Sequence, residues 1–221
     1  MSGLDYSGQV LSLEEVQLLP PVLPGKILGV GLNYLDHIKE SGLAVPDEPY
    51  IVHRPTTCLN SDKGIITLPN PSHYIQYEGE LVVIMGKRCK NISYQVAEDY
   101  IFGYTIGNDI TDKTFFIRDK HFGIAKAFDT MCPLGPYVEN DVDFRHKKII
   151  TKVNGTVMQD GNTDNMIFDV PSLIAYLSQI MTLEPGDVIM TGSPSGVGSL
   201  TVNSTVEVSI DGLGTLINFI R

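Results

Sequence analysis

The chain has 221 residues, 43% hydrophobic and 19% charged, which is enough for one large domain with a substantial core or at most two small domains. Its net charge of −10 argues against nucleic acid or an anionic membrane as a partner, because either would demand a basic surface. We expect a cytoplasmic protein, because the three cysteines show no disulfide or zinc spacing, the N-terminus lacks signal-peptide features and no apolar run could span a bilayer.

The first expected elements are an extended lead-in over residues 1–24 and a short buried strand over residues 26–31. Prolines in the lead-in prevent regular helix and most sheet pairing. The strand contains Gly29 and Gly31, but Tyr34 stands where the third glycine of a dinucleotide-binding fingerprint belongs, and no long helix follows. That fingerprint is therefore excluded, and residues 25–221, which show no internal repeat, are expected to form one domain.

A short helix is expected next, with Asn33 as its N-cap and Gly42 as its terminator. His37 and Glu40 are three residues apart, so on a helix they are neighbours and the carboxylate can orient the imidazole. Because so short a helix is marginal by itself, residues 35–50 are a candidate lid that orders when something binds. The alternative is a surface helix with an incidental histidine and glutamate.

A strand over residues 77–85 places two carboxylates, Glu78 and Glu80, on the same face, and apolar residues make both faces look buried. Two ionised carboxylates inside a fold would cost several kcal/mol unless a positive charge neutralises them, and a divalent metal would do so. The alternative is that both carboxylates lie at the wet start of the strand.

The strand over residues 101–109 has one face with almost no side-chain bulk, formed by Gly103, Thr105 and Gly107, and this face ends in Asp109. Such a face lets a ligand or another backbone approach closely. The alternative is a crossing of two strands with Asp109 as a turn residue.

The remaining elements follow from turn residues and periodicity. We expect strands over 50–55 and 188–190, an edge strand over 65–69, a hairpin at Asn154-Gly155 and a final strand pair across Asp211-Gly212. Two helices are expected: one over 94–100 capped by Ser93, and one opened by Asp169 and Pro171 with a core stripe of Leu173, Ile174, Leu177, Ile180 and Met181. A basic loop is expected over 111–126 and a glycine-rich loop over 191–198.

The three carboxylates Glu78, Glu80 and Asp109 offer only oxygen ligands. This donor set suits Mg²⁺ or Mn²⁺, whereas zinc would draw on histidine or cysteine. With these residues in place, the chain resembles the fumarylacetoacetate hydrolase family, in particular its short, single-domain acylpyruvate hydrolase and oxaloacetate decarboxylase branch. The resemblance runs from about residue 25 to the C-terminus. It is carried by segments 29–34 with His37 and Glu40, 77–81, 103–104, 108–109, 126–130, 132–136, 153–155, 159–163, 166–168 and 182–189.

The resemblance implies a fold of the α+β class that is mainly β, a mixed β-sandwich roll with a few short helices, and residues 25–221 as its catalytic domain. It implies a homodimer in which Glu78, Glu80 and Asp109 hold Mg²⁺ or Mn²⁺. Lys126 matches a lysine that contacts the substrate, and His37 with Glu40 match a lid dyad that activates water.

Some residues depart from the family pattern near the expected substrate. Lys113 replaces an arginine that helps to hold substrate, and lysine supplies charge without a bidentate fork. Arg54 stands where the family commonly has lysine, and Ser193, which follows Gly192, replaces a threonine but keeps the hydroxyl. These four residues are our candidates for binding the substrate, and their identity leaves the substrate open.

The leading hypothesis is hydrolytic C–C cleavage of a β-diketo acid of the acylpyruvate or fumarylpyruvate type. His37, oriented by Glu40, would take a proton from water, which attacks the distal carbonyl, and the metal would stabilise the resulting pyruvate enolate. Decarboxylation of oxaloacetate or a related β-keto acid, and isomerisation of a 2-hydroxy-dienoate, are alternatives at the same site. A non-enzymatic metal-binding protein is a further alternative.

Overall fold

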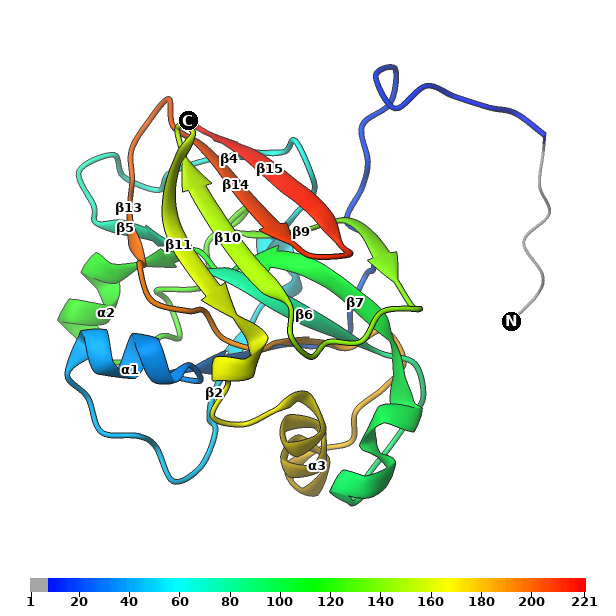
Figure 1. Cartoon of the computed structure of the whole chain (residues 1–221). Coiled ribbons are helices and arrows are strands. Elements are labelled where there is room, and N and C mark those ends of the chain that lie inside the picture. The colour runs from blue at the N-terminus through cyan, green and yellow to red at the C-terminus, as the bar shows by residue number, and fades with distance from the viewer. Residues whose placement is uncertain (1–7) are drawn as a thin grey trace.

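The computed structural model describes residues 8–221, and strands dominate it (Figure 1). The largest sheet has the order β2-β1-β12-β6-β7-β9-β3, a second has the order β11-β10-β14-β15-β4, and a small one has the order β13-β5-β8. Most pairs are antiparallel, whereas β1–β12, β3–β9 and β15–β4 are parallel. The mixed sheets curl into a half-barrel, which confirms the predicted mainly β roll of the α+β class.

The strands are β1 (Ile27–Gly31), β2 (Tyr50–Arg54), β3 (Leu59–Asn60), β4 (Ile65–Ile66), β5 (Ile75–Tyr77), β6 (Gly79–Met85), β7 (Ile101–Asn108), β8 (Thr111–Asp112), β9 (Cys132–Glu139), β10 (Lys148–Val153), β11 (Thr156–Asn162), β12 (Val188–Met190), β13 (Gly198–Leu200), β14 (Thr205–Ile210) and β15 (Gly214–Ile220). The helices are α1 (Leu35–Ser41), α2 (Lys113–Asp119) and α3 (Val170–Ile180), with short 3₁₀ turns at Thr56–Cys58, Tyr94–Tyr100 and Thr163–Asn165. Residues 8–24 contain neither helix nor strand, and the start of the expected lead-in lies outside the described residues.

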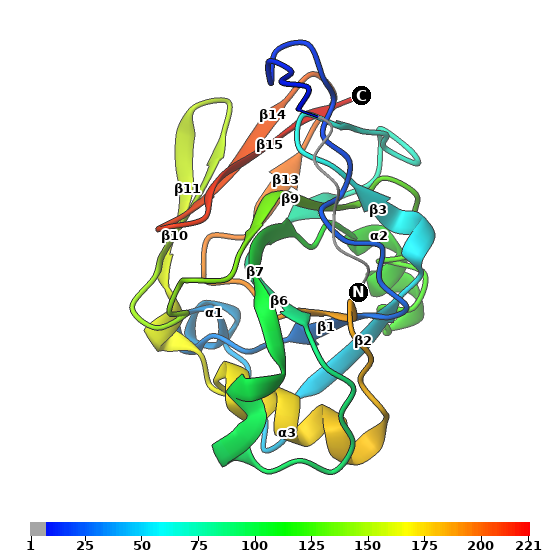
Figure 2. The ribbon, with the colours of Figure 1, turned by 90° about the vertical axis from the view of Figure 1, so that its right-hand side faces the viewer.

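The strand predicted over residues 77–85 is divided at Glu78, which lies between β5 and β6. Strand β6 runs through the middle of the fold and is buried on both faces, as predicted. Leu81 and Val83 join a core cluster that includes Leu216 of β15 and Leu177 of α3. Val82, on the other face, packs in a separate cluster with residues of β9 and β12. Figure 2 shows β6 and β7 between the five-stranded sheet and helix α3. The start of β6 is therefore held by core packing on both sides.

Several sequence predictions are confirmed in detail. Asn154 and Gly155 adopt positive φ angles of 51° and 79° at the β10–β11 hairpin. The Asp169 side chain accepts a hydrogen bond from the Ser172 amide at 3.0 Å and so caps α3. The edge strand predicted over residues 65–69 is confirmed but short: Ile65 and Ile66 form β4, which pairs with β15 at the edge of the five-stranded sheet.

The bare face of β7 is covered by protein. A Cβ atom at Gly103 would lie 2.6 Å from the Glu139 carbonyl oxygen, and one at Gly107 would lie 2.6 Å from a methyl group of Val82. The close approach that these glycines allow is therefore made by neighbouring strands.

Asn33 is not the N-cap of α1, so that prediction is wrong. Tyr34 precedes the helix, and it makes no side-chain capping bond. The Asn33 amide instead donates to the carbonyl oxygens of Phe168 (3.0 Å) and Thr191 (2.8 Å), while its oxygen accepts from the Phe168 amide at 2.8 Å. Asn33 thus joins three segments that are distant in sequence, whereas Gly42 ends the helix at φ 64° as predicted.

The expected loop over 111–126 contains strand β8 and helix α2. The Asp112 side chain caps this helix by accepting from the Thr114 amide at 3.1 Å. Its seven residues show little helical periodicity, and aromatic contacts of Phe115 and Phe116 with later residues help to hold it. The predicted helix over residues 94–100 is present as a 3₁₀ helix, but Ser93 does not cap it through its side chain. Ile180, predicted to lie in the core stripe of α3, is instead 56% exposed.

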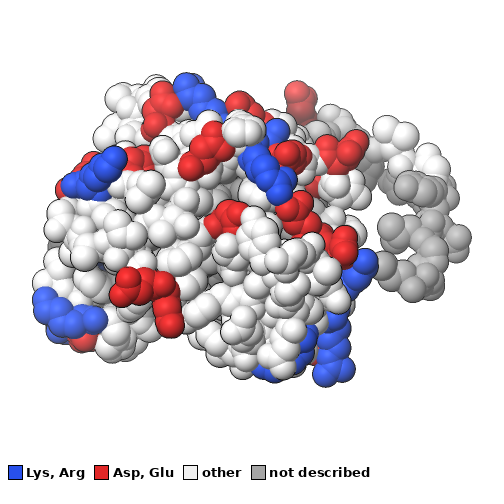
Figure 3. Space-filling model, turned by 60° about the horizontal axis from the view of Figure 1, so that its bottom comes forward, with Lys and Arg blue, Asp and Glu red and all other residues white. Residues whose placement is uncertain are grey.

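Within residues 8–221, no helix combines the length and the apolar character needed to cross a bilayer. The face drawn in Figure 3 carries separate groups of acidic and basic side chains, with no continuous basic area.

Candidate functional site

Glu78, Glu80 and Asp109 come together at one end of the β6–β7 pair. The register pairs Gly79 with Asn108, and the Asp109 amide donates to the Glu78 carbonyl oxygen at 2.8 Å. One carboxylate oxygen from each residue lies within 4.8 Å of the others, and no other such cluster occurs in residues 8–221. Glu80 is 1% exposed, so the alternative of a wet strand end does not hold for it.

Two buried cationic side chains, Lys126 and Arg54, contact this cluster. The Lys126 ammonium lies 3.1 Å from Glu78 Oε2 and 2.6 Å from Asp109 Oδ2. Arg54 forms an ion pair with Asp109 and donates from Nη2 to the Met131 carbonyl oxygen at 2.8 Å. Burial favours the neutral form of Glu78, but Lys126 and the Thr111 hydroxyl outweigh this and hold the pKa of Glu78 below its usual range.

Glu80 is the carboxylate in this cluster that forms no ion pair with any described residue. Its side chain accepts a hydrogen bond from the Gly192 amide at 2.9 Å. Burial raises the pKa of Glu80 to about 8; Lys126 opposes this rise and the Glu78 carboxylate adds to it. The donor set fits a hard divalent cation such as Mg²⁺ or Mn²⁺, because all three ligands are oxygens and the buried Glu80 lacks a positive partner.

We expect the metal-free protein to lose stability as the pH rises from about 5 to 8. The folded state keeps a proton on Glu80 over a range in which the unfolded chain, with a pKa near 4.5, has released it, so the free energy of unfolding falls with pH. Thermal melts with chelator at several pH values measure this fall, and Glu80→Gln should flatten it. A wild-type slope equal to that of Glu80→Gln would contradict this account of Glu80.

His37 and Glu40 both lie on α1. His37 Nδ1 is buried without a hydrogen-bond partner and lies 3.6 Å from Glu40 Oε2, just beyond hydrogen-bond distance. Both residues line a cavity of about 490 Å³ together with Glu78, Asp109 and Lys126. The fold therefore brings the predicted dyad and two of the predicted metal ligands, Glu78 and Asp109, to one cavity.

The four candidate substrate-binding residues lie in different places. Lys113 lines the cavity with its ammonium 4.2 Å from the Phe116 ring centroid, and burial lowers its pKa. Arg54 is buried against Asp109 and does not line the cavity. Gly192 and Ser193 do not line it either. Their polar groups are already engaged: the Gly192 amide donates to Glu80, and the Ser193 hydroxyl accepts from Gln159 Nε2 at 2.7 Å.

Sequence reasoning missed an aromatic wall of this cavity, formed by Phe116 and Phe122. The two rings stack with centroids 4.2 Å apart and an interplanar angle of 20°. Lys113 and Phe116 are three residues apart, so recognition of helix α2 would have placed both on one face. The wall gives the cavity an apolar side next to its carboxylates.

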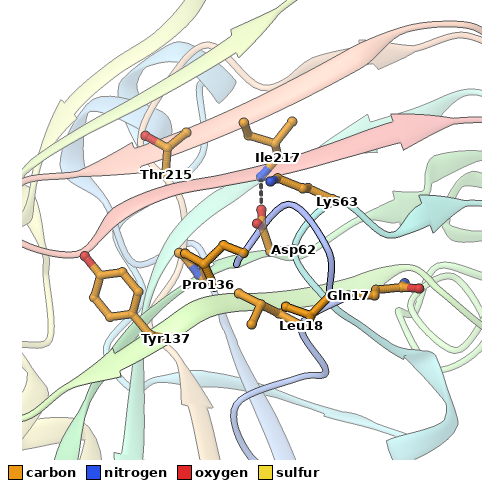
Figure 4. Close-up of a pocket in the computed structure, with 10 residues that line it drawn as sticks. Gln17, Leu18, Asp62, Lys63, Pro136, Tyr137, Thr215 and Ile217 are labelled. Atoms are coloured by element: carbon orange, nitrogen blue, oxygen red, sulfur yellow. Dashed lines mark hydrogen bonds between the residues drawn. The ribbon is translucent and has the colours of Figure 1, made fainter. Parts of the chain in front are cut away.

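A second hollow lies elsewhere, between the N-terminal segment and strands β9 and β15 (Figure 4). It has a volume of about 360 Å³ and is lined by residues that include Leu18, Tyr137 and Ile217. Its Asp62 side chain accepts from the Ile217 amide at 2.9 Å. The hollow includes none of the three clustered carboxylates and none of the dyad.

The chain is similar to known proteins over nearly its whole length. A family model described as fumarylacetoacetate (FAA) hydrolase C-terminal matches residues 26–221. Human mitochondrial oxaloacetate tautomerase is 38% identical over 222 residues, which cover 95% of this chain and 71% of that protein.

Two solved structures are also similar. The 5-carboxymethyl-2-hydroxymuconate delta-isomerase of Mycobacterium smegmatis has a TM-score of 0.90 and 38% identity, covering 97% of this chain and 85% of that one. The fumarylpyruvate hydrolase of Pseudomonas aeruginosa, solved in complex with Mn²⁺ and pyruvate, has a TM-score of 0.84 and 31% identity, covering 89% of each chain.

Proposed function

The chain belongs to the fumarylacetoacetate hydrolase family, and from this premise we propose that it is a divalent-metal-dependent hydrolase that cleaves a C–C bond in an acylpyruvate. The observation that carries the proposal is the shared cavity, in which the His37–Glu40 dyad lies with carboxylates of the Glu78, Glu80 and Asp109 cluster. The fumarylpyruvate hydrolase with Mn²⁺ and pyruvate, a structural relative, supports both the substrate class and the metal.

Glu78, Glu80 and Asp109 would hold Mg²⁺ or Mn²⁺. A cation bound there acts as a Lewis acid on the oxygens of a 2-oxo acid. Lys126, whose ammonium already lies among these carboxylates, would add positive charge beside the substrate carboxylate. Lys113 would supply a second ammonium at the wall of the cavity.

His37 would act as the general base. Its imidazole takes a proton from water, and Glu40 orients the ring and stabilises the positive charge that the ring gains. The water oxygen attacks the distal carbonyl carbon, the C–C bond breaks, and its electron pair passes to the pyruvate half. His37 then returns the proton to that half, so the products are pyruvate and a carboxylic acid.

Keto–enol tautomerisation of oxaloacetate is the second candidate function. This reaction moves a proton and needs no attacking water, so the imidazole of His37 in the cavity would be enough to carry it out. The 38% identical human protein, an oxaloacetate tautomerase, supports this candidate. Decarboxylation of oxaloacetate and isomerisation of a 2-hydroxy-dienoate would use the same cavity, and the isomerase of M. smegmatis supports the latter.

The test is a panel of acetylpyruvate, fumarylpyruvate, enol-oxaloacetate and a 2-hydroxy-dienoate with Mg²⁺ or Mn²⁺, with products identified by NMR. We expect pyruvate and a carboxylic acid from the acylpyruvates. Conversion of enol-oxaloacetate to the keto form, with no cleavage of either acylpyruvate, would replace hydrolysis by tautomerisation. Carbon dioxide release would identify the decarboxylase.

We also propose how the protein assembles and where it is located. A homodimer follows from the family resemblance, and light scattering on the purified protein tests it. A cytoplasmic location follows from the cysteine content, and the partners we propose are a small 2-oxo acid and a second copy of the chain.

A further inference from the structure

We propose that Asp36 and Ser195 are positioning residues that hold helix α1 on the glycine-rich loop and so place Glu40 beside His37. This inference rests on the proposed role of the His37–Glu40 dyad. It concerns two residues that neither belong to the carboxylate cluster nor line the cavity themselves, although Asp36 Oδ1 accepts from the His37 amide at 3.0 Å.

Helix α1 is attached to the loop over residues 191–198 at two points one helical turn apart. Asp36 Oδ2 accepts from the Ser195 hydroxyl at 3.1 Å and from the Ser195 amide at 3.3 Å. Glu40 accepts from the Gly196 amide, at 3.1 Å to Oε2 and 3.3 Å to Oε1. Asp36 and Glu40 are four residues apart, so they lie on one face of the helix, and this face is the attached one.

The loop is held in place by hydrogen bonds to residues of neighbouring strands. Gln159 Nε2 donates to the Ser193 hydroxyl and, at 2.9 Å, to the Pro194 carbonyl oxygen. The Tyr77 hydroxyl donates to the Gly196 carbonyl oxygen at 2.9 Å. Gly196 itself has φ +90°, and a Cβ atom there would lie 2.0 Å from the Met158 carbonyl oxygen. The position of the loop is therefore set by its neighbours.

The same loop reaches the clustered carboxylates. Its Gly192 amide donates to Glu80 Oε2 at 2.9 Å. Four residues later, the Gly196 amide donates to Glu40. A short stretch of fixed backbone thus joins Glu80 to Glu40. This arrangement sets the position of the dyad carboxylate relative to the carboxylate cluster.

Helix α1 needs such an anchor. It has only seven residues, and a helix of this length is marginal without tertiary contacts. Glu40 is exposed, and its partners among the described residues are the Gly196 amide and, at 3.6 Å, His37. If the Asp36–Ser195 contact is lost, the hydrogen bonds from the Gly196 amide to Glu40 are the ones left between this face of α1 and the loop within residues 8–221. We then expect Glu40 to move relative to His37.

The test compares Ser195→Ala with Ser199→Ala in acylpyruvate hydrolysis. Ser199 follows shortly in the chain, is exposed, and pairs with Gln76 of β5. We expect Ser195→Ala to lower kcat by about 10-fold with KM within twofold, because displaced catalytic groups slow turnover more than they weaken binding. Asp36→Ala should do the same, whereas Ser195→Thr, which keeps the hydroxyl, and Ser199→Ala should stay near the wild type.

A double-mutant cycle separates positioning from general stability. In a Glu40→Gln background, Ser195→Ala should cause little further loss of kcat, since the group that it positions has been removed. Equal losses in both backgrounds, or an equal loss in Ser199→Ala, would overturn the proposal.

Amide hydrogen exchange tests the attachment of α1 to the loop without a measurement of turnover. Hydrogen exchange at the Gly196 amide should be about 10-fold faster in Ser195→Ala than in the wild type, because Glu40 leaves it more often. Unchanged exchange would overturn the anchor. A wild-type protein that turns over no 2-oxo acid would overturn the proposed function instead, and the exchange result would still decide the anchor.

Discussion

Replacing Glu80 with glutamine is expected to abolish metal binding and turnover while leaving the metal-free protein at least as stable as the wild type at neutral pH. Glutamine has the shape of glutamate but cannot supply a charged ligand oxygen. Turnover should fall by more than about 100-fold, since even residues that only orient metal ligands typically contribute 10- to 100-fold. The metal-free protein should not suffer, because Glu80 is buried and has no cationic partner among the described residues.

Titration calorimetry with Mn²⁺ and thermal melts with and without metal measure the two effects. The wild type should melt at a higher temperature when Mn²⁺ is added, whereas Glu80→Gln should not respond. Glu184→Gln is the matched control, because Glu184 is only partly buried, pairs with Arg88 and is not part of the cluster. A Glu80→Gln protein that binds Mn²⁺ as tightly as the wild type would remove Glu80 from the metal site.

Replacing His37 with glutamine is expected to slow acylpyruvate hydrolysis by about 10²- to 10⁴-fold, the usual contribution of a general base. Decarboxylation of oxaloacetate should survive if the protein has that activity, because it needs no activated water. Metal binding should also survive, since His37 is not part of the carboxylate cluster. Steady-state rates on both substrates, with Mn²⁺ affinity measured in parallel, give the comparison.

His53→Gln is the control for this variant, because His53 is exposed on β2 and does not line the cavity. Wild-type hydrolysis by His37→Gln would show that water is activated by another group. Loss of both hydrolysis and enol–keto conversion, with metal binding intact, would point to a proton shuttle through His37 in both reactions.

The carboxylate cluster could be predicted because its evidence is local. Alternation along residues 77–85 places Glu78 and Glu80 together, and apolar residues on both faces place that strand in the core. Asp109 follows the adjacent strand β7, so ordinary antiparallel pairing brings it to the same end. The hairpin at Asn154-Gly155 and the capped helix α3 were predictable for the same reason, since turn and capping residues act on their immediate neighbours.

Features that depend on distant contacts could not be predicted from their own segments. Asn33 looks like a helix cap, but its side-chain amide donates hydrogen bonds to the carbonyl oxygens of Phe168 and Thr191, more than 130 residues away. Helix α2 has weak periodicity and is held by aromatic contacts that the segment alone does not reveal. The polar groups of Gly192 and Ser193 suit a substrate loop, and only the fold shows that Glu80 and Gln159 engage them.

The proposed site unites three separate kinds of chemistry in one cavity. Oxygen ligands at the end of β6 and β7 would hold the cation, Lys126 and Lys113 would supply positive charge, and the proposed dyad on α1 would transfer the proton. The glycine-rich loop ties the first of these to the third through Gly192 and Gly196. All these groups are set by the packing of β6 and by the loop that follows β12.

The most direct test of the account is the rate of acetylpyruvate cleavage by the wild-type protein before chelation, after chelation, and after Mg²⁺ or Mn²⁺ is restored. The account predicts that pyruvate and acetate form with either metal, that chelation abolishes their formation, and that added metal recovers it. Cleavage that continues at the same rate after chelation would contradict the metal-dependent site at Glu78, Glu80 and Asp109.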